Sequence, residues 1–570
     1  MVYCGKPSKG CGECRSRKIR CDQVRPACSQ CNRAKRDCPG YRDQLSLMFR
    51  DESKSVVRKA AAAKHRNERT DQRADRSSRT AIQERNPVRP GLTTVVEPDF
   101  AFSSDPHHIY FMQQLGQCPL EIQPSQEIDT AKHEAICYFL QSNAIPGTFW
   151  TTDMVSKFLS QTGGPASQKA MQASVVATAT AMLSRVRGLP SLKEVAHREY
   201  GSALRLLNSA LADINEAKTN QTLGTVVLLA IYEVVTSRSP EHIDSWTNHI
   251  NGAAALLDLR GTDQLKNDAG LRLFLHLRYQ IVISCLQRDA RVPKSLLECT
   301  KVAMFLCPAE AHGNRLVMII GKLSNLRADI RTDSLNNEWE IISAASAIEA
   351  DLLAWLAALP PEFSYTTHVT SPFDSVFRQR FCGISPYGDQ YHVYPTLWVC
   401  NSWNQYRSAR IVVSEIILSH VRKLSNSSSL SSLSDEFRLQ YRTLRSTIRR
   451  LAVEICRTVP FHFNAHQAHS ERNLPPPESY MGGLVLLWPL FVAGIVEKPG
   501  HALRRWVIKC LEMIGNTMGL DQALAVADIV AADPGVLHSV TEEEDPLIYM
   551  SDAPDPISPL RKHICFEGLR

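Results

Sequence analysis

The spacing of apolar residues along most of the chain is that of amphipathic α-helices. From about residue 105 onward, apolar positions recur every three or four residues, so that they share one face of a helix. No stretch shows the regular two-residue alternation of a β-strand. One predicted helix has a buried face that is formed by Tyr200, Ala203, Leu204, Leu207, Leu211 and Ile214.

Two longer apolar runs predict elements that are buried on all sides. Residues 222–237, TLGTVVLLAIYEVVTS, are apolar nearly all round a helix. Residues 482–496, GGLVLLWPLFVAGIV, are too few for a usual membrane span and include a proline. We predict a buried helix or strand there, with a re-entrant membrane segment as the alternative. Serine- or proline-rich breaks lie at 238–240, 359–361, 425–434 and 474–478. The pattern predicts a mainly α fold, a large bundle of antiparallel helix pairs.

Residues 43–90 interrupt this helical pattern. They are polar and charged, and apolar residues do not recur at coiled-coil a and d positions over three heptads. We therefore expect a flexible basic linker at 43–104, between a small N-terminal module at 1–42 and a large helical domain at 105–570. A homodimer formed through the linker is the alternative.

The charge of the chain is divided unevenly. Residues 1–90 hold 23 Lys and Arg against 10 Asp and Glu, whereas the other 480 residues hold 42 against 48. A basic head on a mildly acidic body favours a polyanionic partner for the head, and a merely solvated basic tail is the alternative. The first ten residues show no apolar secretory segment. We therefore expect a reducing compartment, in which close thiols bind metal rather than form disulfides.

Six of the 17 cysteines lie within residues 11–38 in the order C-x2-C-x6-C, repeated 17 residues later. They are Cys11, Cys14, Cys21, Cys28, Cys31 and Cys38. Zinc takes four ligands in a tetrahedron, and six thiolates complete two such sites if two of them bridge the metals. The symmetry of the repeat points to Cys11 and Cys28 as bridges, because each opens one half. A disulfide framework, a single four-cysteine zinc site and an iron–sulfur cluster are the alternatives.

This pattern resembles the fungal Zn(II)2Cys6 binuclear cluster family of transcription factors, which also has a loop proline, here Pro26. Residues 246–261 and 403–418 are similar to stretches of the helical fungal-specific transcription factor domain. The resemblance implies two zinc ions bridged by Cys11 and Cys28, a nuclear location and a regulatory role for the helical domain. It also implies sequence-specific binding of double-stranded DNA at CGG-type triplets, to regulate RNA polymerase II genes of metabolic or secondary-metabolite pathways. We also expect the protein to bind the transcription machinery or a co-regulator.

The segment RSRKIR between Cys14 and Cys21 is the candidate reader of DNA. Held by metal at both ends, six residues can form a helix despite their shortness. Arg or Lys on such a helix can donate to guanine in the major groove. By the resemblance, Lys18 is central in reading the triplet and Arg17 assists it.

The remaining cations of the module are expected to contact phosphates, which orient a protein on DNA without specifying a sequence. Alternatively, these cations only offset the negative charge of the cluster. The expected phosphate contacts are Arg15, Arg20, Arg33, Lys35 and Arg36.

No signature of an enzyme is found in the sequence: Walker, GxGxxG, GxSxG and HExxH motifs are absent. His462, His466 and His469 have spacings compatible with a metal, but a polar loop is favoured there. Residues 541–556 mix acidic and large apolar side chains, which is typical of activation segments, although a solvated linker or a docked end fits as well. No membrane partner is expected. The rival interpretation is a zinc-dependent module that binds RNA or a protein without recognising duplex sequences.

Overall fold

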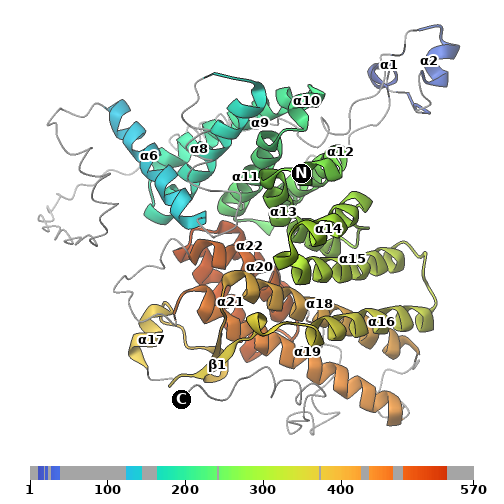
Figure 1. Cartoon of the computed structure of the whole chain (residues 1–570), viewed down its shortest axis with the longest axis vertical. Helices are drawn as coiled ribbons and strands as arrows, with labels where there is room; N and C mark the ends of the chain where they lie inside the picture. Colours follow the sequence, from blue (N-terminus) through green and yellow to red (C-terminus); the bar gives the residue numbers. More distant parts are fainter. Residues whose placement is uncertain are drawn as a thin grey trace, which may run out of the picture. The chain divides into compact units, whose positions relative to one another are not determined.

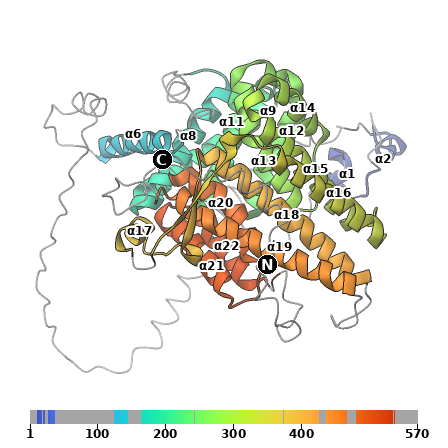
Figure 2. The same cartoon turned by 60° about the horizontal axis from the view of Figure 1, so that its bottom comes forward.

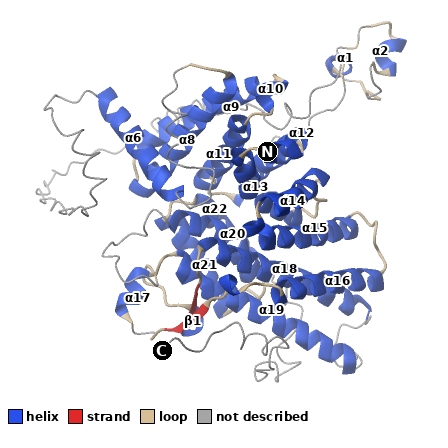
Figure 3. Ribbon diagram, viewed as in Figure 1, coloured by secondary structure: helices blue, strands red, loops and turns tan. Residues whose placement is uncertain are grey.

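The structure is a computed structural model of the 570-residue chain. It describes residues 11–17, 19–22, 27–36, 38, 124–143, 163–240, 243–371, 374–424, 435–465, 479–533 and 535. The chain divides into two compact units, one of residues 1–50 with 132–570 and one of residues 51–131. The regular structure of the described residues is almost entirely helical (Figure 1 and Figure 3), which confirms the predicted mainly α fold.

The helices belong to two parts of the chain, the N-terminal module and the helical body. The N-terminal module contains α1 (Gly12–Ser16) and α2 (Ser29–Arg33), each of five residues. The helical body contains, in order, α6 (Pro124–Asn143), α8 (Ala166–Arg187), α9 (Pro190–Leu211), α10 (Ile214–Ala217), α11 (Asn220–Thr236), α12 (Ile243–Arg260), α13 (Asp268–Gln287), α14 (Lys294–Leu306), α15 (Ala311–Arg331), α16 (Glu338–Ala357), α17 (Ser375–Arg380), α18 (Leu397–Leu424), α19 (Asp435–His462), α20 (Ser479–Gly494), α21 (Ala502–Thr517) and α22 (Asp521–Ala532).

Helices α8 and α9 form an antiparallel pair whose turn is specified by a glycine and a proline two positions apart. α8 ends at Arg187 and is capped by Gly188, whose φ of 66° is a left-handed conformation that glycine adopts without strain. α9 begins at Pro190, where the missing N–H of proline would have had no helical partner in any case. The pair packs closely along its length because α8 buries small side chains, among them Ala173, Ala177 and Ala181.

The predicted apolar face of α9 is confirmed for its central residues and wrong at its end. Three of its members are buried: Ala203, Leu207 and Leu211. Ile214 is 57% exposed because α9 ends at Leu211 and a separate helix, α10, follows. Asp213 starts α10 by accepting hydrogen bonds from the backbone N–H groups of its first turn, which the periodicity of apolar residues does not reveal.

Both long apolar runs are helices inside the body. The first lies in α11, which packs against α8, α9, α12, α13 and α22. The second forms most of α20, which packs against α18, α19, α21 and α22. Glycines let α20 approach its neighbours: a Cβ at Gly483 would lie 2.4 Å from Sδ of Met518. Among the described helices, none combines the length and the apolar character that crossing a membrane requires.

Helices α18 and α19, of 28 residues each, lie side by side, as Figure 2 shows. Near them lies a hairpin that was not predicted from the sequence: β1 (Thr366–Val369) pairs antiparallel with β2 (Gln390–Val393). The expectation of a body without strands is wrong at this point. Each strand has only four residues and β1 is exposed on both faces, so neither leaves an alternating pattern in the sequence.

A buried polar cluster links the hairpin region to α18 and α19. Nη1 of Arg407 donates to the hydroxyl of Tyr394 at 2.8 Å, and its Nη2 lies 3.6 Å from a carboxylate oxygen of Glu454. The same carboxylate accepts from the Tyr365 hydroxyl at 3.3 Å, and Nε2 of His392 lies 3.3 Å from it. Burial lowers the pKa of His392 to about 4, so this imidazole is neutral at physiological pH.

His462 is the last residue of α19 and is buried, so the polar loop predicted around it is wrong for this residue. Its Nδ1–H donates to the carbonyl of Gly482 at 3.1 Å. Its Nε2, which is then an acceptor, lies 3.2 Å from Sγ of Cys400. Burial lowers the pKa of His462 to about 3. His466 and His469 lie outside the described residues.

Candidate metal and DNA-binding site

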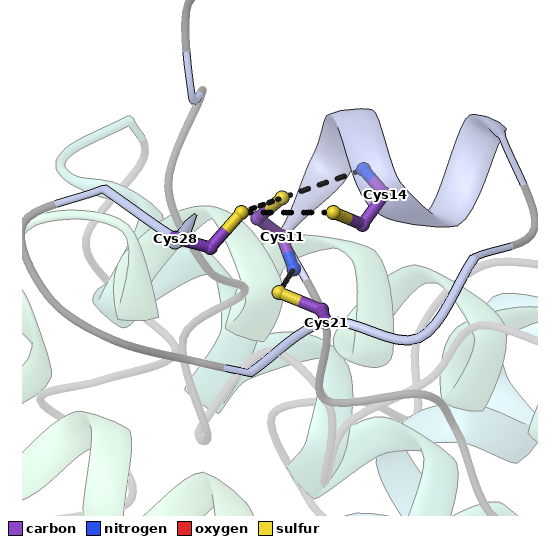
Figure 4. A group of neighbouring side chains, drawn as sticks. All are labelled: Cys11, Cys14, Cys21 and Cys28. Atoms are coloured by element: carbon purple, nitrogen blue, oxygen red, sulfur yellow. Dashed lines mark hydrogen bonds between the residues drawn. The ribbon is translucent and has the colours of Figure 1, made fainter. Parts of the chain in front are cut away.

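The six cysteines of the repeat come together in the N-terminal module. Their sulfur atoms form two groups of four, and within each group they lie within 4.8 Å of one another. One group is Cys11, Cys14, Cys21 and Cys28, drawn in Figure 4, and the other is Cys11, Cys28, Cys31 and Cys38. Cys11 and Cys28 belong to both groups, as bridging ligands must, and their sulfurs are 3.6 Å apart.

These distances fit zinc. Four sulfurs at about 2.3 Å from a tetrahedral zinc ion are separated by about 3.8 Å. The Cys11–Cys31 and Cys14–Cys28 sulfur pairs are each 3.6 Å apart. Two tetrahedral ions with two shared sulfurs therefore account for all six thiolates. The arrangement is that of a binuclear zinc cluster, and the zinc ions would supply the cross-links that hold this module in one shape.

Each half of the module uses its first cysteine to start a short helix. The backbone N–H of Cys14 donates to Sγ of Cys11 at 3.4 Å, at the start of α1. Cys28 is the N-cap of α2, and its sulfur accepts from the backbone N–H of Cys31 at 3.3 Å. The sequence repeat is thus a structural repeat, in which backbone N–H groups stabilise the negative charge of the bridging sulfurs.

The thiols of the module need a cation to ionise together. Burial is the main cause that raises the pKa of Cys14 to about 12, and hydrogen bonds that its thiol donates to neighbouring cysteines add to the rise. Crowded thiolates repel one another, which favours the protonated thiols. A divalent ion between them instead favours the thiolates and takes the place of the protons. Zinc binding at this site therefore releases protons.

The helix predicted over RSRKIR is shorter than expected. α1 ends at Ser16, and Arg17 lies in a turn. The chain turns there because it must return Cys21 to the cluster: the N–H of Ile19 donates to the carbonyl of Cys14 at 3.0 Å. The second half repeats this bond 17 residues later, from the N–H of Arg36 to the carbonyl of Cys31 at 3.0 Å. The cluster geometry overrides the helical tendency of the intervening residues.

Most of the predicted DNA-contacting cations lie on the surface of the module. Arg15 belongs to α1, and Lys18 lies outside the described residues. The exposed cations are Arg17, Arg20, Arg33, Lys35 and Arg36. The sulfurs occupy the interior. The exposed charges are therefore turned towards a polyanion, except that of Arg36, which pairs with Glu13.

Two acidic residues of the module were missed by the sequence analysis. Both carboxylate oxygens of Asp22 accept from the backbone N–H of Ser29, at 3.2 and 3.1 Å. Oε1 of Glu13 accepts from Nη1 of Arg36 at 2.8 Å. Both are isolated acids in a basic stretch of the sequence. An acid among cations has potential partners nearby, and this pattern could have pointed to them.

Comparison with known proteins agrees with both parts of the chain. Residues 9–47 match the fungal Zn(2)-Cys(6) binuclear cluster domain, and residues 136–404 match the fungal specific transcription factor domain. Transcription factor dbaG of Emericella nidulans is 25% identical over 347 residues, which cover 56% of this chain and 74% of that protein. White-opaque regulator 2 of Candida albicans is 47% identical over 38 residues, which cover 7% of this chain and 8% of that protein. No solved structure matches the chain.

A cluster of six cysteines joined to a large helical domain defines a zinc-dependent transcription regulator. Proteins of this class bind DNA, and the class is one of regulators rather than enzymes. The chain belongs to the fungal Zn(II)2Cys6 binuclear cluster transcription factors that carry a helical fungal-specific transcription factor domain.

Proposed function

We propose that this transcription factor acts in the nucleus and recognises CGG-type triplets in double-stranded DNA through its zinc module. The observation that carries the proposal is the pair of four-sulfur groups sharing Cys11 and Cys28, surrounded by exposed cations. The six cysteines of the two groups are the zinc ligands. A rigid, metal-shaped surface with outward cations is suited to a groove of DNA, because charge then meets the phosphates in a fixed pattern.

The cations divide into two roles in this proposal. Lys18, assisted by Arg17, reads the triplet by donating to guanine. The phosphate contacts are assigned to Arg15, Arg20, Arg33 and Lys35. Arg36 is not assigned a phosphate contact, because its guanidinium already pairs with the carboxylate of Glu13.

The rest of the chain has a regulatory role in the proposal. Residues 43–104 join the DNA-binding module at 1–42 to the helical domain at 105–570, which recruits a co-regulator or the transcription machinery. Residues 541–556, outside the described residues, act as an activation segment. The factor works as a monomer or a homodimer, and its targets are metabolic or secondary-metabolite genes.

Fluorescence anisotropy with labelled duplexes tests the proposal. The full chain is expected to bind a duplex with CGG triplets more tightly than a scrambled duplex of equal length, and to lose this preference with a zinc chelator. Equal affinity for both duplexes, or tighter binding of an RNA of the same sequence, would instead support the zinc-dependent RNA- or protein-binding module. Mapping the occupied genomic sites of the tagged protein identifies the target genes.

A further inference from the structure

Two polar contacts join the halves of the zinc module independently of the sulfur atoms. One is the contact from Asp22 to the N–H of Ser29, where the second half begins. The other is the ion pair between Glu13 of the first half and Arg36 of the second, with 2.8 Å between Oε1 and Nη1. This ion pair engages the guanidinium of Arg36, although the side chain stays exposed.

Both ends of the Glu13–Arg36 pair are anchored beside the cluster. Glu13 lies in the first turn of α1, directly before Cys14. Arg36 follows α2, and its own N–H donates to the carbonyl of Cys31 at 3.0 Å. Because each residue is fixed to a different half, a bond between their side chains restrains the angle between α1 and α2.

We infer that Arg36 is a positioning residue, which together with Glu13 sets the relative orientation of the two halves of the module for DNA recognition. The inference rests on the proposed recognition of duplex sequences. The side chain of Arg36 is 59% exposed and that of Glu13 is 24% exposed, and exposed ion pairs contribute little to folding. The effect of the pair is therefore expected in the preference among DNA sequences, with zinc content unchanged.

A direct phosphate contact by Arg36 would have different consequences. It would add affinity for every duplex, and its loss would lower the dependence of affinity on salt by about one contact. An ion pair that only orients the two halves instead changes the ratio of the affinities for matched and scrambled duplexes. Exchange of the two charges keeps the ion pair between the halves, but it places a carboxylate at position 36, where a phosphate contact would need a cation.

The test uses the full chain with four alterations. These are Glu13→Gln, Arg36→Gln, the exchange of Glu13→Arg with Arg36→Glu, and the control Arg33→Gln on α2. Anisotropy titrations at several salt concentrations with CGG and scrambled duplexes give the affinity ratio and the salt dependence, and metal analysis gives the zinc content. Each single change at the pair is expected to lower the affinity ratio about two- to fivefold, and the exchange to restore it to within about twofold.

The control separates the two roles. Arg33 is exposed and carries no ion pair with the described residues. Arg33→Gln is expected to weaken binding to both duplexes equally and to reduce the salt dependence. An unchanged affinity ratio in both single variants, an exchange as poor as the singles, or loss of zinc from a single variant would overturn the inference. If the unaltered chain itself does not distinguish the duplexes, the proposed function fails and the inference fails with it.

Discussion

The folds of the zinc module and of the helical body are stabilised by different interactions. In the described part of the module, the buried side chains are those of Cys11, Cys14, Cys28 and Cys31. The body buries a large aliphatic and aromatic core, with helices of up to 28 residues. A helix of five residues has no stability of its own in water, and a module this small cannot bury enough apolar surface. Metal binding therefore determines the fold of one part and side-chain packing the fold of the other.

The two parts also place their charges differently. The module keeps cations on its surface, whereas the body encloses Arg407 and Glu454, each side chain at most 3% exposed. Exposed cations are free to meet phosphates. The enclosed charges of Arg407 and Glu454 instead pair with each other inside the body. This contrast supports the proposal that the module binds DNA through its exposed cations.

Zinc removal is the change with the largest expected effect. A chelator should unfold the module and abolish DNA binding, because structural zinc contributes on the order of 10 kcal/mol or more per ion. Hydrogen exchange is expected to accelerate throughout residues 11–38 and to stay slow in α11 and α18. Accelerated exchange in the body as well would show that its fold also depends on metal.

Acid should destabilise the body through its enclosed histidines. Burial lowers the pKa of His392 to about 4 and that of His462 to about 3, below the ordinary value of 6.5. The unfolded chain therefore binds more protons below pH 6.5, so stability is full above that pH and falls as the pH drops towards 4. Each histidine is expected to contribute about 1.4 kcal/mol per pH unit of this fall. Urea unfolding from pH 7 to 4.5 measures it, and His462→Asn should reduce the slope.

Breaking the buried ion pair should destabilise the body and spare the module. Glu454→Ala leaves the guanidinium of Arg407 enclosed without its carboxylate, an effect of about 3–5 kcal/mol on the free energy of unfolding. Glu199→Ala, which removes the partner of the mostly exposed Arg198, is the control and should change stability by about 0–1 kcal/mol. Denaturant titrations compare them. Similar values for both variants, or loss of zinc from the Glu454 variant, would contradict the account.

Loss of the reading cation should have the smallest effect on the protein and a specific effect on recognition. Lys18→Ala is expected to reduce the preference for CGG over scrambled duplexes by about 1–3 kcal/mol, with no change in zinc content. Competition binding at fixed salt measures this preference. Lys35→Ala, at the matching position of the second half, should weaken binding to both duplexes alike. A fully retained preference in the Lys18 variant would exclude it as the reader.

Sequence patterns predicted the features that repeat or extend over many residues. The cysteine spacing predicted the two sulfur groups and their shared members, and the apolar runs predicted a buried helix, α11, and a buried helix or strand, which is the helix α20. Features formed by contacts between distant residues left no such pattern. The four-residue strands of the hairpin, the burial of His462 and the ion pair between Glu13 and Arg36 all depend on partners far away in the chain. The helix predicted over RSRKIR was longer than the observed α1, because the metal cluster rather than local helix propensity determines where the chain turns.

The central claim is that two zinc ions share the sulfurs of Cys11 and Cys28. Native mass spectrometry of the full chain tests it most directly, with Cys4→Ser as a control outside the repeat. The account predicts two zinc ions per chain, in the unaltered protein and in the Cys4 variant alike, and fewer in a Cys11→Ser variant. A single zinc ion, or none, in a chain that still recognises its duplex would contradict it.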